Sequence, residues 1–158
     1  MTLTRNNPMI PRPARQRCGV VALESAFVLP ITFFTLFALL DLGLAAVRFN
    51  SLSEAARCVA REVILHGSMA IDSPDVWGPS EFNGTAASNS NIVRPAQLVL
   101  PTMRLEDVIV AVSWIDSDNS ARDRVRVRMT YQHQPLIPVL FAWGTLDLRA
   151  ETTMRIVN

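Results

Sequence analysis

The feature that most constrains this chain is an apolar stretch near its start, from Val20 to Val47, which only Glu24 and Asp41 interrupt. As an α-helix at about 1.5 Å per residue, these 28 residues extend about 42 Å, whereas the hydrocarbon core of a bilayer is about 30 Å thick. Phenylalanines and leucines occur on every face of that helix, which favours lipid over the core of a soluble protein. We therefore predict a transmembrane helix, with a buried core helix as the alternative.

Residues 1–19 are a basic leader with four arginines, no acid and three prolines that prevent a stable helix. Positive charge before the apolar stretch predicts a cytoplasmic N-terminus and a C-terminal part on the other side of the membrane. The rival interpretation is a secretory signal peptide cleaved near Ala45 and Ala46. Its apolar core would span only about 7–15 residues, which is shorter than the stretch found here.

Charge composition excludes some classes of function. The net charge of +1 combines a leader of +4 with a remainder in which 11 arginines face 14 acids, which gives −3. A body of this charge is atypical of a nucleic-acid-binding protein. All 15 cationic residues are arginine, so a lysine-based active site is excluded.

Glu24 lies inside the apolar stretch, where a carboxylate at the bilayer centre costs on the order of 2.5–3.5 kcal/mol. It follows Gly19 by five residues, between a basic leader and an apolar run, and this pattern resembles the processing site of type IV prepilins. The resemblance implies that a membrane peptidase cleaves between Gly19 and Val20. Glu24 would then pair with the new α-amino group of Val20 in a neighbouring subunit, because two buried charges tolerate apolar surroundings only together. A signal-anchor helix with Glu24 at the membrane interface is the alternative.

A more specific similarity covers about residues 17–66. The sequence Gly-Val-Val-Ala-Leu-Glu-Ser-Ala-Phe-Val-Leu-Pro, residues 19–30, is similar to the start of the TadE-like proteins, the pseudopilins or minor pilins of the tight-adherence (Flp) pilus system. The similarity continues through an acid at Asp41 and the run Ala-Ala-Arg-Cys-Val-Ala-Arg at residues 55–61. The rest of the chain resembles the family only in general character.

This resemblance implies a membrane-anchored minor pilin required for assembly of a tight-adherence pilus. The implied partners are a prepilin peptidase, other pilins and pilus assembly proteins, and the lipid bilayer. The implied location is the bacterial inner membrane, single-pass, with a periplasmic C-terminal domain and association with the pilus. The alternative is a signal-anchored periplasmic binding module without a pilus role. We expect no enzymatic activity, no cofactor and no nucleic-acid partner.

A helical pattern continues beyond the membrane to about His66, where Gly67 is a typical stop signal. Apolar residues recur there at spacings of three and four, namely Phe49, Leu52, Ala56, Val59 and Val63. Residues 20–66 are thus predicted to form one transmembrane and stalk helix of about 70 Å. Pro30 lies inside this helix and can kink it. We expect the stripe to pack on the sheet of the outer domain, with the helix of another subunit as the alternative.

Residues 67–158 are predicted to form a small β-rich periplasmic domain that begins with a long loop, 67–92. Apolar and alternating patterns predict three later strands, at Val108–Ile115, Arg122–His133 and Leu146–Ile156. The expected fold class is α+β: a long N-terminal transmembrane and stalk helix followed by a small antiparallel, pilin-like β-sheet. The apolar segment 135–143 is expected to cover the core, or alternatively to form an exposed patch that touches a partner or the membrane.

The outer domain has few candidate residues for ligand binding or catalysis. The arginines at 124, 126 and 128 are expected to form a solvated strand face paired with Asp147 and Glu151. The Asp116-x-Asp118-x-Ser120 spacing lacks the glycine and the glutamate of a calcium loop, so no metal site is expected. Cys58 would be the single cysteine left after cleavage, either as a small buried residue or in a disulfide between subunits. His66 is expected to cap its helix or to interact with the helix dipole.

Overall fold

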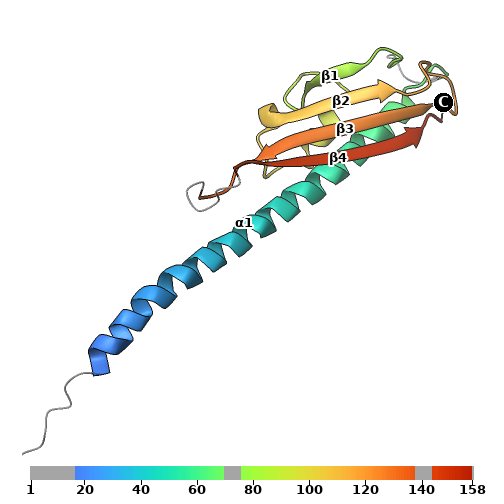
Figure 1. Ribbon diagram of the computed structural model, residues 1–158. Helices are drawn as coiled ribbons and strands as arrows, with labels where there is room; N and C mark the ends of the chain where they lie inside the picture. The colour runs from blue at the N-terminus through green and yellow to red at the C-terminus, as the bar shows by residue number, and fades with distance from the viewer. Residues whose placement is uncertain (1–16, 70–75, 138–143, 158) are drawn as a thin grey trace, which may run out of the picture. The chain divides into compact units, whose positions relative to one another are not determined.

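The computed structural model describes residues 17–69, 76–137 and 144–157, and it has the predicted α+β architecture (Figure 1). The chain divides into two compact units, Met1–Leu36 and Phe37–Asn158. The elements are the helices α1 (Arg17–Leu65) and α2 (Arg94–Gln97), the short 3-10 helix η1 (Leu105–Asp107), and the strands β1 (Phe82–Thr85), β2 (Val108–Trp114), β3 (Arg124–His133) and β4 (Leu146–Arg155).

In the first unit, the described residues form the N-terminal part of α1. Residues 19–36 are exposed around the whole helix although nearly all of them are apolar. The hydroxyl groups of Thr32 and Thr35 donate hydrogen bonds to the carbonyl oxygens of Val28 and Ile31, each at 2.9 Å, so neither hydroxyl needs water. Within the described residues, α1 is the one helix long and apolar enough to cross a membrane.

The second unit contains a four-stranded sheet of order β1-β2-β3-β4 in which every neighbouring pair is antiparallel. The three predicted strands are confirmed, with small differences at their ends. β3 begins at Arg124 instead of residue 122 because Arg122 has φ of 82°, a left-handed conformation that a strand cannot contain. The turn before it also contains Ser117 at φ of 59°.

The strand β1 lies inside the segment that the sequence indicated as a long loop. Its residues Asn83, Gly84 and Thr85 pair with Ala111, Val110 and Ile109 of β2. A four-residue segment with a glycine and two polar residues has no alternating pattern. It is a strand because the edge of the apolar β2 supplies hydrogen-bonding partners.

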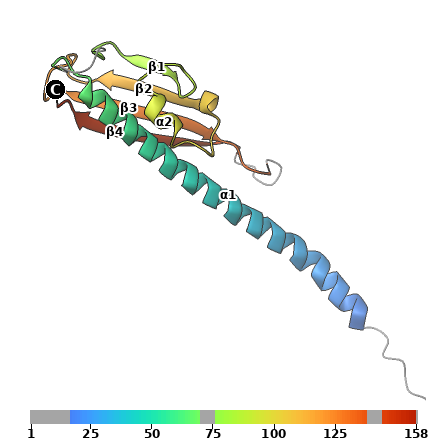
Figure 2. The same cartoon turned by 180° about the vertical axis from the view of Figure 1, so that it is seen from behind.

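The C-terminal part of α1 covers one face of this sheet (Figure 2). Its residues that are fully inaccessible to solvent are Leu52, Ala55, Ala56, Val59, Ala60 and Val63. They belong to one apolar core with the inward residues of the strands, among them Val110, Val127 and Met129. The predicted packing of the stripe on the sheet is confirmed from Leu52 onward. Phe49, which the stripe included, is 44% exposed.

The end of α1 is held by His66 and Trp77. His66 Nδ1 lies 2.8 Å from the carbonyl oxygen of Glu62, and because a carbonyl can only accept, the ring nitrogen donates. The two rings stack with centroids 3.8 Å apart, and the Trp77 amide donates to the His66 carbonyl at 3.0 Å. The predicted capping role of His66 is thereby confirmed.

Candidate functional site

The residues of the predicted processing site lie on the first turns of α1. Gly19, Val20 and Glu24 are all exposed, and Val20 has 67% of its surface accessible. A Cβ atom built on Gly19 would meet nothing within 4 Å, so no contact inside the chain requires a glycine there. Glu24 has no hydrogen bond or ion pair with any described residue. Cleavage after Gly19 stays a prediction.

The residues assigned to the membrane helix fall into two different environments. Pro30 belongs to the exposed first unit and interrupts the helical hydrogen bonds without ending α1. Asp41 and Val47 belong to the second unit, where Val47 is half-exposed and Asp41 is only 8% exposed. Asp41, the acid that interrupts the apolar stretch, is therefore buried in the sheet domain.

Asp41 is buried against the segment that follows β3. Its Oδ1 atom accepts a hydrogen bond from the backbone amide of Leu136 at 3.0 Å. The same oxygen lies 3.3 Å from Nε2 of His133, whose side chain is 2% exposed. The geometry of this second contact falls short of a hydrogen bond, so its attraction is electrostatic.

Arg48 completes the cluster and determines which nitrogen of His133 carries the proton. Its Nη1 atom lies 2.7 Å from His133 Nδ1. A guanidinium group can only donate, so Nδ1 accepts and the ring proton lies on Nε2, facing Asp41. Arg48 also donates from Nε to the carbonyl of Thr102 at 3.2 Å and lies 5.5 Å from the ring centroid of Tyr131. We call Asp41, Arg48 and His133 the polar cluster.

Helix spacing and strand register bring the polar cluster together. Asp41 and Arg48 are seven residues apart, two turns, and so share one face of α1. His133 is the last residue of β3, on the inward face that also contains Met129 and Tyr131. No role for His133 could be predicted from its neighbours in the sequence, although the alternation of β3 places it toward the core.

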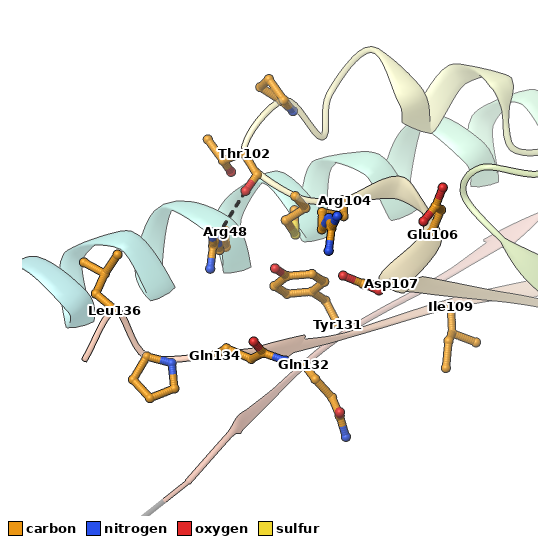
Figure 3. A pocket seen from close by; sticks show the side chains of 13 residues that line it. Arg48, Thr102, Arg104, Glu106, Asp107, Ile109, Tyr131, Gln132, Gln134 and Leu136 are labelled. Atoms are coloured by element: carbon orange, nitrogen blue, oxygen red, sulfur yellow. Dashed lines mark hydrogen bonds between the residues drawn. The ribbon is translucent and has the colours of Figure 1, made fainter. Parts of the chain in front are cut away.

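Two cavities flank the polar cluster. The larger, of about 740 Å³, has Arg48 and Tyr131 in its wall together with polar side chains from the segment before β2 and from the end of β3 (Figure 3). Its wall includes both signs of charge, from Arg104 and Asp107, which favours no single class of ligand. The smaller, of about 220 Å³, lies beside Asp41 and His133 and is otherwise lined mainly by apolar side chains such as Leu146.

The outer face of the sheet contains ion pairs of the predicted kind. Glu151 pairs with Arg126 at 3.1 Å and with Arg128 at 2.9 Å. Asp147, the other predicted partner, has no ion pair among the described residues. Arg124 binds Asp116 instead, at 2.7 Å, and its hydrogen bonds lower the pKa of that carboxyl to about 2.

Two further features considered in the sequence are a metal site and Cys58. In the part of the chain that the structure describes, no group of three or more histidines, cysteines or acids could hold a metal ion. Cys58 is partly buried on α1, with Sγ 3.9 Å from Glu54 Oε1. Burial, and then the charge of Glu54, raise the pKa of this thiol. Glu54 also pairs with Arg57 at 3.6 Å.

A comparison with known protein families gives a match over the part of α1 that contains the predicted processing site and polar side chains of this helix. Residues 19–61 match the model of a family described as TadE-like protein. Searches of the curated proteins and of the solved structures found no significant match. The matched segment begins at Gly19 and includes Glu24, Asp41 and Arg48. The resemblance seen in the sequence to the TadE-like proteins is therefore confirmed over this segment, residues 19–61.

Proposed function

We propose that this chain is a membrane-anchored minor pilin or pseudopilin required for assembly of a tight-adherence (Flp) pilus. The observation that carries the proposal is the TadE-like match over residues 19–61, which supports a protein associated with this pilus system. The proposed partners are a prepilin peptidase, other pilins and pilus assembly proteins, and the lipid bilayer.

Processing after Gly19 gives a physical reason for two features of α1. Glycine weakens a helix by about 1 kcal/mol relative to alanine, and no contact in the chain requires it at this position. Close approach of a peptidase to the backbone is a reason to keep it. Cleavage would also create an α-amino group on Val20, a cation that can pair with the Glu24 carboxylate of a neighbouring subunit.

The exposed helix supports a membrane location. Residues 19–36 present apolar side chains on all sides, which water would not favour. We propose a single-pass protein of the bacterial inner membrane, with the leader in the cytoplasm and the sheet domain in the periplasm. The sheet domain would act by recognition of other pilus components and not by catalysis.

N-terminal sequencing and intact mass of the protein extracted from membranes test the proposal. The expected mature chain starts at Val20 with a methylated amine. A chain that still starts at Met1 would support the signal-anchored binding module, and a start near Ala46 would indicate a secretory signal peptide. Either result would overturn the processing step.

A matched pair of variants separates processing from folding. A Cβ atom meets nothing within 4 Å at Gly19 or at Gly43, so a leucine at either position is accommodated by α1. Gly19→Leu should leave the leader attached and abolish surface adhesion, whereas Gly43→Leu should be processed like the unmodified protein. Equal processing of the two variants would refute the assignment of Gly19.

A further inference from the structure

Three exposed leucines of the sheet-bearing unit gather near Asp41. They are Leu42 (66% exposed), Leu136 (57%) and Leu146 (47%), and we call them the leucine rim. Leu42 and Leu146 line the 220 Å³ cavity that also contains Asp41. Leu136 joins them because its backbone amide binds the Asp41 carboxylate. Leucines that are about half exposed or more at one place on a domain indicate a surface that another apolar phase covers.

The length of the apolar helix indicates which phase this is. Val20 to Leu40 contains 21 residues, which extend about 32 Å as an α-helix and match the hydrocarbon core of about 30 Å. The next residue, Asp41, would then lie at the membrane surface, which is the point along the chain where a carboxylate first requires a polar partner. Leu136 and Leu146 lie beside Asp41 within the same unit, so they reach that surface as well, whatever the tilt of the helix before Leu36.

The polar cluster lowers the free-energy cost of placing this part of the domain against lipid. The Asp41 carboxylate is directed at the Leu136 amide and at His133, and Arg48 covers the other side of the His133 ring. The Asp41 carboxylate and the Arg48 guanidinium therefore have their hydrogen-bond partners inside the domain. The leucine rim presents alkyl side chains around them, which is the combination that an interfacial membrane contact requires.

We propose that the leucine rim inserts into the surface of the bilayer that anchors α1, on the side where the helix emerges. The sheet domain would therefore be held against the membrane by its own apolar side chains and would not hang freely from the anchor. The inference rests on the membrane anchoring proposed above, and its occupant is the lipid of the adjoining leaflet.

Spin labels on single cysteines in the full chain, reconstituted into lipid nanodiscs, test this inference. Cys18→Ser and Cys58→Ser remove the native thiols, and Leu136→Cys or Leu146→Cys introduces one label in the rim. Leu98→Cys is the matched control, because Leu98 is an exposed leucine of the same unit (88%) outside the rim. Ile31→Cys reports on the anchor itself. The readout is the ratio of collision rates with oxygen, which partitions into lipid, and with a water-soluble nickel chelate.

The expected result is a several-fold higher oxygen-to-nickel ratio at positions 136 and 146 than at position 98. A ratio equal to that at 98 would overturn the proposal. So would a fall in both collision rates at 136 and 146, because it would mean that protein covers the rim, as another pilus subunit would. If the label at 31 also reads as aqueous, the membrane anchoring fails. If 31 reads as lipid while the rim reads as aqueous, the leucine rim proposal alone fails.

Discussion

Replacement of Asp41 by alanine tests whether the polar cluster holds α1 to the sheet domain. The substitution removes the acceptor of the Leu136 amide, which lies 3.0 Å from Asp41 Oδ1. It also removes the negative charge 3.3 Å from His133 Nε2. The imidazole N–H, which has no hydrogen-bond partner among the described residues even with Asp41 present, would then face a cavity that is lined mainly by apolar side chains.

The magnitude follows from these two losses. A hydrogen bond to a charged group contributes about 1.5–3 kcal/mol, and the lost attraction between the carboxylate and the imidazole N–H adds to this. The Asp41 carboxylate is itself costly to bury, which offsets part of the sum. We expect Asp41→Ala to lower the free energy of unfolding of the sheet domain by about 1.5–3 kcal/mol. Asp41→Asn keeps an amide oxygen as an acceptor and should lose less than half as much.

The assay is urea unfolding of the full chain in detergent micelles, followed by near-ultraviolet circular dichroism of the packed aromatic side chains. Glu54→Ala is the control, because Glu54 lies on the same helix in an exposed i,i+3 pair whose loss costs less than about 1 kcal/mol. A loss for Asp41→Ala no larger than for Glu54→Ala would refute the reasoning. Equal losses for the alanine and asparagine variants would refute the role given to the acceptor.

Other contacts give further expectations. Leu52→Ala removes a fully buried side chain and should lower the free energy of unfolding by about 2–5 kcal/mol in the same urea assay. Gly78→Ala should lower the thermal midpoint, because Gly78 has φ of 97° and a Cβ atom there would overlap the Trp114 indole. The carboxyl carbon of Asp116 should titrate by NMR near pH 2, since its bonds to Arg124 lower its pKa to about 2. This contribution to stability is complete above about pH 4, the ordinary range of an aspartate, and is lost as the pH falls through 2; Asp116→Asn should abolish that dependence.

The helix and the three main strands could be predicted from the sequence because each has a strong local pattern. The alternation of Val125, Val127 and Met129 identifies a half-buried strand without tertiary information. The start of that strand could not be located from the sequence. Arg122 has a left-handed backbone, but arginine is common in both strands and loops, so the residue type does not indicate this conformation. β1 was missed for the opposite reason: the edge of β2 determines its conformation, not its own residues.

The candidate site was predictable in part. Glu24 and Gly19 could be singled out because they are five residues apart, and Asp41 because a charge interrupts an apolar run. The partners of Asp41 could not be found in this way. His133 and Leu136 follow it by 92 and 95 residues, so only the folded sheet brings them together.

Asp41 also explains how one apolar helix serves two surroundings. Before Leu36, α1 is exposed on every side and its large side chains suit lipid. From Asp41 onward, buried residues recur on a single face, and several of them are alanines that let the helix approach the sheet closely. The sidedness of burial distinguishes the two parts, because lipid surrounds a helix and a sheet covers only one face of it. The acid marks the change, since its carboxylate is satisfied only where the sheet domain begins.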